Sequence, residues 1–220
     1  MLSIGGVLLS EHASWYLSRA SGIVAWGLAT LTVVLGLLFS ARTTVPKPAW
    51  ALALHRHSGA LCCWTVLSHV FLLLGDKWLN PSVRSLVVVG AMQWRGTAVA
   101  FGQIGLYLLL LVQLSGFLQK RVSKRLWHVW HLLSVPAWIL STMHYLTAGS
   151  DTKGLGGYVA WAGVGVVAAT TTWRLGAREG RKERKRAVPS GRAVTDATPQ
   201  SSPDIAKRLE ELQKKRSTRA

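Results

Sequence analysis

The chain has 220 residues, half of them hydrophobic, and a formal net charge of +17. Its apolar residues gather into runs of about 20, long enough to cross a bilayer as helices. An open sheet or an irregular crossing segment is excluded, because its backbone groups would lack hydrogen-bond partners in lipid. The charge does not indicate a nucleic-acid partner, because 14 of the 26 Lys and Arg residues lie after Trp173. No nucleic acid is therefore expected to bind.

The apolar runs predict an all-α membrane protein with a bundle of five transmembrane helices. The runs cover residues 15–40, 49–74, 97–118, 126–146 and 158–173. Residues 83–93 are apolar but short, so we expect an interfacial or partly buried helix there; a sixth span is the alternative. We expect a multi-pass protein of the plasma membrane with three parts. These are a leader (1–14), a transmembrane domain (15–175) and a basic, largely disordered tail (176–220) with a short helix at 203–216.

The distribution of Lys and Arg predicts how the chain crosses the membrane. Basic residues follow the first span at Arg42 and Lys47, follow the third span at 120–125, and fill the tail. Positive segments face the cytoplasm, so the N-terminus is expected outside and the C-terminus inside. The second and fourth spans then run parallel, from inside to outside. Anionic lipid is the expected partner of the basic tail.

Four histidines within these two parallel spans carry the functional prediction. His55 and His69 lie 14 residues apart, and His131 and His144 lie 13 apart, a rise of about 20 Å along a helix. Parallel helices would therefore present His55 with His131 at an inner level and His69 with His144 at an outer level. Ionisable groups inside a membrane are rare and usually functional.

Haem iron takes one axial imidazole from each facing helix, so each histidine pair predicts one haem. No Cys-x-x-Cys-His motif occurs, so two non-covalent b-type haems are expected. Zinc would need its ligands clustered tetrahedrally rather than split between two levels. The alternatives are histidines that only pack and hydrogen-bond, or another metal.

The spacing in the fourth span fits an ideal helix less well. Fourteen residues fall about 40° short of four turns, but thirteen fall about 140° short. An ideal helix would aim His131 and His144 in different directions. Pro136 lies between them and permits a kink, which we expect to re-aim one end.

Other polar residues near the ends of these spans are candidates for the haem propionates. Arg56, His57 and His128 lie near the basic edge, where cations would meet carboxylates; snorkelling to the interface is the alternative. His57 and His128 also compete as ligands, with a poorer match in depth. Arg19 is expected either to bind an outer propionate or to anchor the first span at the interface.

These residues resemble the ferric-reductase-like transmembrane domain family, which is related to the membrane cores of ferric reductases and NADPH oxidases. The resemblance rests on the run 15–22, on Leu54-His55-Arg56 with His69, on Trp127-x-x-x-His131, and on His144 with Gly149-Ser-Asp151. It covers about residues 15–175. It implies two stacked b haems, with His55 and His131 and also His69 and His144 as the axial pairs. It implies electron transfer from a cytosolic flavin to an acceptor outside.

The chain departs from the larger relatives after its fifth span. The remaining 45 or so residues contain no Gly-x-Gly-x-x-Gly and are too short for a flavin and nicotinamide domain. The expected function is an oxidoreductase component, a di-haem electron-transfer subunit whose donor is a separate cytoplasmic flavoprotein. Basic segments 120–125 and 181–186 would steer such an acidic partner, or serve topology and lipid binding alone. The alternatives are a quinol-linked cytochrome b subunit and an anchoring subunit with structural haem.

Overall fold

The computed structural model describes residues 13–41, 48–187, 207 and 210–211, in which every regular element is a helix. The chain forms two units, Met1–Glu179 and Gly180–Ala220. The predicted leader lies outside the described residues up to position 12. The same is true of the predicted helix at 203–216, apart from three helical positions within it.

Four described helices are long and apolar enough to cross a membrane. They are α1 (Ala13–Ser40), α2 (Ala49–Leu74), α4 (Gly96–Leu118) and the first part of α7, Leu155–Ala177. Many of their large apolar side chains point away from the protein: Phe71 is 73% exposed and Phe117 is 76% exposed. Large apolar surfaces of this kind suit contact with lipid. The described part of the chain is thus a helical membrane protein.

The expected continuous fourth span is instead two helices, α5 (Lys124–Leu132) and α6 (Ser134–Ala148), which meet at Leu133. Neither is long enough by itself to qualify as a span. Pro136 explains the break, because proline lacks the N–H that would bond to the Leu132 carbonyl. The interruption puts Pro136 in the first turn of α6, where a missing N–H costs little. His131 and His144 therefore lie on different helices, and one helical repeat no longer fixes their directions.

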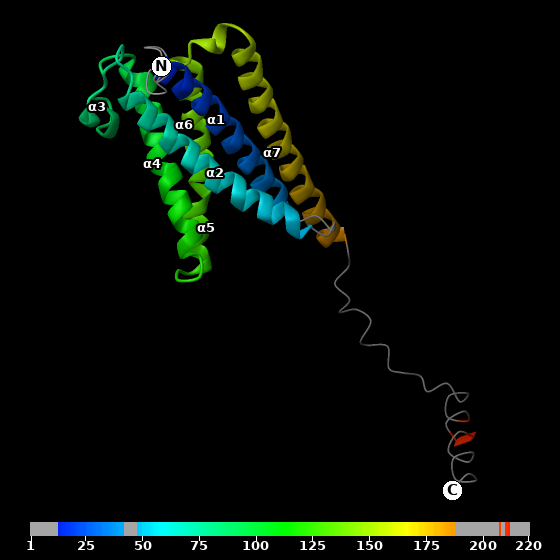
Figure 1. Cartoon of the computed structure of the whole chain (residues 1–220). Coiled ribbons are helices and arrows are strands. Elements are labelled where there is room, and N and C mark those ends of the chain that lie inside the picture. The colour runs from blue at the N-terminus through cyan, green and yellow to red at the C-terminus, as the bar shows by residue number, and fades with distance from the viewer. Residues whose placement is uncertain (1–12, 42–47, 188–206, 208–209, 212–220) are drawn as a thin grey trace, which may run out of the picture. The chain divides into compact units, whose positions relative to one another are not determined.

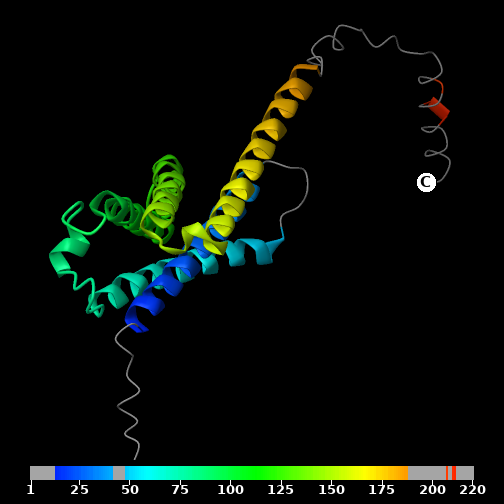
Figure 2. The ribbon, with the colours of Figure 1, turned by 90° about the horizontal axis from the view of Figure 1, so that it is seen from above.

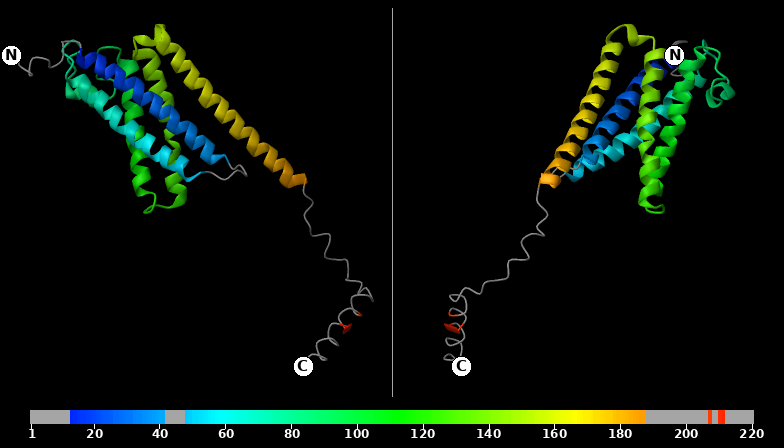
Figure 3. Two further views of the ribbon diagram at one scale, coloured as in Figure 1. Left: turned by 45° about the vertical axis from the view of Figure 1, so that its right-hand side comes forward. Right: turned by 180° about the vertical axis from the view of Figure 1, so that it is seen from behind.

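Helices α1, α2, α4, α5 and α6 of the first unit form two groups, and within each group neighbouring helices run antiparallel (Figures 1 and 3). α1 packs along α2, and α4 packs along α5 and α6. α2 and the α5–α6 segment run in the same direction, as expected for the second and fourth spans. Two reciprocal hydrogen bonds of 3.0 Å join the groups: Trp26 Nε1 donates to the Thr142 hydroxyl, and Trp138 Nε1 donates to the Thr30 hydroxyl.

The last helix, α7 (Leu155–Ala187), packs against α1 through a small aromatic cluster. Trp26 stacks on Tyr145 with ring centres 5.1 Å apart, and Ala160 of α7 is fully buried against them. Gly163 brings α7 close, because a Cβ there would collide with the Trp26 indole. Small residues allow this kind of close approach between helices in lipid. The helix continues past the apolar run into the first part of the basic tail, over residues 176–187.

Replacing Gly163 with leucine is expected to destabilise the protein by about 1–3 kcal/mol, the usual cost of overpacking a tight contact. Thermal unfolding in detergent would measure the loss. Gly165→Leu is the matched control, because no atom lies within 4 Å of a Cβ at Gly165. Equal melting temperatures for the two variants would contradict the packing of α7 on Trp26.

Residues 83–93 contain no helix long enough to cross a membrane. The sequence favours a short interfacial or partly buried helix there over a sixth span. They hold α3 (Val83–Val87), which has 5 residues, and a turn at Gly90 with φ of +79°. The segment lies beside one end of α4 (Figure 2). The buried Gln103 of α4 holds this segment in place. Its amide donates to the carbonyls of residues 85, 86 and 88 at 2.9–3.2 Å and accepts from the Gly90 N–H at 3.1 Å. Tyr107 also donates to the Val87 carbonyl.

Replacing Gln103 with leucine is expected to release this segment. The change removes the Gln103 amide from the Gly90 N–H and from three carbonyls, of which the Val88 carbonyl keeps its bond from the Ala91 N–H. A buried group left unsatisfied costs about 1–3 kcal/mol. Amide hydrogen exchange across residues 85–91 should accelerate strongly, while exchange in α7 stays unchanged. Exchange in the segment at the wild-type rate would show that Gln103 does not hold it.

Candidate metal-binding site

The structure brings the four predicted histidines together in two facing pairs. The rings of His55 and His131 have centres 6.0 Å apart, with planes at 60°. The rings of His69 and His144 have centres 6.4 Å apart, with planes at 76°. Because the two α2 histidines are 14 residues apart, the pairs lie at two levels of the bundle, about 20 Å apart along that helix.

The separation of the facing rings suits one metal ion between each pair. A metal–imidazole nitrogen bond is about 2 Å, and each ring centre lies about 1 Å behind its nitrogen, so two ligated imidazoles have centres about 6 Å apart. No group of three or more His, Cys, Asp or Glu side chains that could hold a metal occurs among the described residues. Each pair thus offers two protein ligands, the number that an axially ligated haem requires.

Three of the four histidines are held by a neighbouring helix through Nδ1. Their hydrogen bonds to backbone carbonyl oxygens measure 2.7–3.0 Å: His69 to Ser18, His144 to Ala98, and His55 to Thr32. A neutral imidazole that donates from Nδ1 carries its lone pair on Nε2. Metal-binding histidines are typically oriented by a hydrogen bond of this kind. These three side chains are therefore oriented as ligands.

Each accepting carbonyl lies four residues before a glycine that leaves room for the imidazole. A Cβ would lie 3.1 Å from the His69 ring at Gly22, 2.7 Å from His144 Nδ1 at Gly102, and 3.3 Å from His55 Cε1 at Gly36. We call each combination of a glycine with the carbonyl four residues before it a glycine seat. The sequence predictions did not include these residues. Their signal was the 14-residue spacing of Gly22 and Gly36, which equals that of His55 and His69.

His131 differs from the other three histidines. Its ring stacks on Trp127 of the same helix, with centres 5.1 Å apart and planes at 18°. Nδ1 of His131 is buried and has no hydrogen-bond partner in the described part of the chain, and neither has Nε1 of Trp127. The His55–His131 pair thus has one oriented imidazole, whereas the His69–His144 pair has two.

The other predicted candidates lie outside the two pairs. His57 and His128 are both exposed, and His57 Nδ1 bonds at 2.7 Å to the Ala53 carbonyl of its own helix. Arg56 is exposed next to His55 and makes no hydrogen bond or ion pair to the described residues.

Arg19 pairs with Asp151, which follows α6. Its Nε donates to the carboxylate at 3.1 Å, a salt bridge forms beside it, and the guanidinium lies 4.0 Å from the centre of the Trp15 ring. The side chains are 25% and 41% exposed, so the pair contributes at most about 1 kcal/mol. Arg19 thus acts as an anchor between α1 and the segment after α6.

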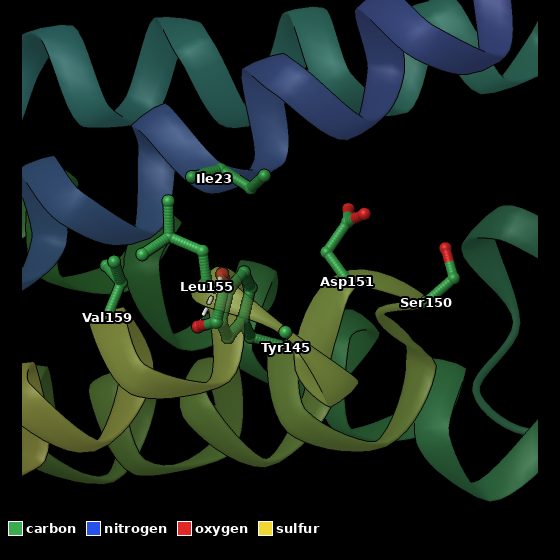
Figure 4. A pocket seen from close by; sticks show the side chains of 8 residues that line it. Ile23, Tyr145, Ser150, Asp151, Leu155 and Val159 are labelled. Atoms are coloured by element: carbon green, nitrogen blue, oxygen red, sulfur yellow. Dashed lines mark hydrogen bonds between the residues drawn. The ribbon is translucent and has the colours of Figure 1, made fainter.

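A cavity of about 560 Å³ lies beside this anchor (Figure 4). Ile23, Leu155 and Val159 form its apolar wall, and Asp151 and Ser150 lie at its other side. Tyr145 also lines it and donates its hydroxyl to the Gly156 carbonyl at 3.1 Å. Two lining residues follow site residues directly, since Tyr145 comes after His144 and Ile23 comes after Gly22. No histidine is among its described lining residues, because consecutive positions of a helix point in different directions.

The chain matches no known family model, no curated protein and no solved structure.

Proposed function

We propose that this protein is a b-type cytochrome subunit that holds two haems and carries electrons across a membrane. The observation that supports it best is the pair of facing histidine sites, with ring centres 6.0 and 6.4 Å apart at two levels. A bound haem supplies a one-electron iron couple, and the protein supplies ligation, orientation and exclusion of water.

The chain's own residues have defined tasks in this proposal. His55 with His131 would hold the iron of one haem, and His69 with His144 would hold the iron of the other. The glycine seats hold three of the rings with Nε2 facing inward, and so reduce the reorganisation needed on binding. Arg56 is the propionate partner at the first level. Arg19 already pairs with Asp151, so Arg19 can bind a propionate only if this ion pair opens.

Orientation and partners belong to the same proposal. The protein lies in the plasma membrane with its N-terminus outside and its C-terminus in the cytoplasm, following the Lys and Arg distribution. Electrons pass from a separate cytoplasmic flavoprotein to the His55–His131 level, then to the His69–His144 level and an acceptor outside. The basic tail binds anionic lipid. The resemblance to the ferric-reductase-like family supports this direction of transfer.

The test is a reduced-minus-oxidised absorption spectrum of the purified protein, expressed with ample haem, with haem quantified per chain. Low-spin b-type bands and a value near two are expected. A value near one would remove the transmembrane relay, and colourless protein would end the haem proposal.

A quinol-linked cytochrome is the second candidate function, and the cavity beside the Arg19–Asp151 ion pair favours it. Its apolar wall and the Asp151 carboxylate suit a ring that carries hydroxyl groups. Quinol should then reduce the protein in membranes free of nicotinamide cofactor, and Val159→Trp, which fills the cavity, should block that reduction. Reduction by quinol at an equal rate in this variant would exclude the cavity as the quinol site.

A further inference from the structure

The absence of a glycine seat for His131 is the least explained feature of the two histidine pairs. The other three histidines share one arrangement, in which the ring lies on a glycine and Nδ1 donates to the carbonyl four residues earlier. Nδ1 of His131 is buried and has no partner among the described residues. A buried polar atom without a partner costs about 1–3 kcal/mol, so a ring position that gives Nδ1 a partner would be more stable.

The register of the helices shows where a fourth seat would lie. On α1 the two seat glycines are 14 residues apart, as are the two histidines that they hold on α2. On α4 the known seat is Gly102, and the residue 14 positions later is Gly116. His131 lies 13 residues before His144 on the α5–α6 segment, which runs antiparallel to α4. Because antiparallel helices rise equally per residue, Gly116 lies level with His131 to within about one residue.

Gly116 also lies on the correct side of α4 and is open. A step of 14 residues turns a helix by about 40° less than four full turns, so Gly116 lies close to the face that carries Gly102. Gly116 is exposed, and no atom lies within 4 Å of a Cβ built there. α5, which carries His131, packs against α4. The carbonyl four residues earlier belongs to Val112, and it now accepts a bond of 2.6 Å from the Ser115 hydroxyl.

We propose that Gly116 and the Val112 carbonyl form the fourth glycine seat, which His131 occupies when haem is bound. The inference rests on the proposed haem function and adds Gly116 as a positioning residue. The helix break at Leu133 lets α5 turn without moving α6. His131 then leaves Trp127, its Nδ1 donates to the Val112 carbonyl, and its Nε2 faces His55. The Val112 oxygen already accepts the helical bond from the Gly116 N–H. It has two lone pairs, so the His131 bond takes the place of the Ser115 bond.

The experiment compares Gly116→Leu with Gly165→Leu, since both glycines are exposed helical positions with open space around them. Without a fourth seat, the two substitutions are equivalent and both proteins bind two haems. With it, Gly116→Leu should bind one haem per chain while Gly165→Leu binds two. The milder Gly116→Ala should keep both haems and shift the midpoint potential of only one, because the hydrogen bond of a ligand tunes the metal.

The outcomes separate this inference from the proposed function. Wild-type protein with two haems, together with Gly116→Leu that keeps both haems at unchanged potentials, would overturn the fourth seat and leave the haem function standing. Wild-type protein without haem would overturn both. Should Gly116→Leu fail to fold, Gly116→Ala decides, and unshifted potentials in that variant would overturn the inference.

Discussion

Replacing His69 with leucine is expected to remove the haem of the His69–His144 level and to stop transmembrane electron transfer. A leucine side chain has no atom that can ligate iron, and the remaining His144 supplies only one of the two ligands. Loss of a hydrogen-bond partner of a metal ligand typically lowers activity by about 10- to 100-fold. Loss of the ligand itself should lower the rate of transmembrane electron transfer by more than that. Haem per chain should drop from two to one.

His57→Leu is the matched control for this variant. His57 lies on the same helix but is exposed and bonded within that helix. The control should keep both haems and the wild-type rate. The comparison also tests the anchoring alternative, because a subunit with structural haem would keep its partner's activity after loss of His69. Full electron flow in His69→Leu protein that carries one haem would exclude the conduit.

Replacing Gly102 with leucine is expected to have the second largest effect. A Cβ at Gly102 would lie 2.7 Å from His144 Nδ1 and 2.8 Å from Cγ, so the ring must leave its seat and its bond to Ala98. Overpacking costs about 1–3 kcal/mol of stability, and loss of the orienting bond weakens haem binding by about 10- to 100-fold. Haem titration of the apoprotein measures the affinity of each site.

Gly27→Leu is the control for the Gly102 variant, because Gly27 is an exposed glycine of α1 with no atom within 4 Å of a Cβ. Its haem affinity should equal that of the wild type. An unchanged affinity of both sites in Gly102→Leu protein would show that the glycine seat does not position His144. The Gly102 and Gly116 variants should also weaken different haems, which their potentials would distinguish.

The break in the fourth apolar run shows how far the sequence could predict the fold. Proline forbids an uninterrupted helix, so Pro136 made a bend between His131 and His144 predictable. The sequence does not specify which residue forms the break, and in the structure it is Leu133. A proline is accommodated best in a first turn, and the structure places the break accordingly. The extension of α7 to Ala187 escaped prediction, because its charged residues suggested disorder although they are also compatible with a helix.

Some residues of the candidate site could likewise be predicted from the sequence, and others could not. His55, His69, His131 and His144 could be chosen from the sequence because ionisable residues are conspicuous within apolar runs. The glycine seats could not, since glycine is common in membrane helices and only its contact with an imidazole distinguishes Gly102 from Gly165. The ion pair of Arg19 with Asp151 joins residues 132 positions apart, and no local pattern links them.

The sequence by itself determined the apolar helices, their relative directions and the two levels of histidines, because length, hydrophobicity and rise per residue are local properties of a chain. Only the tertiary structure decided which surfaces meet. The facing imidazoles and the carbonyls that orient three of them arise from contacts between helices, and among the described residues no such contact reaches Nδ1 of His131. Such contacts depend on the shapes of surfaces that lie far apart in the chain.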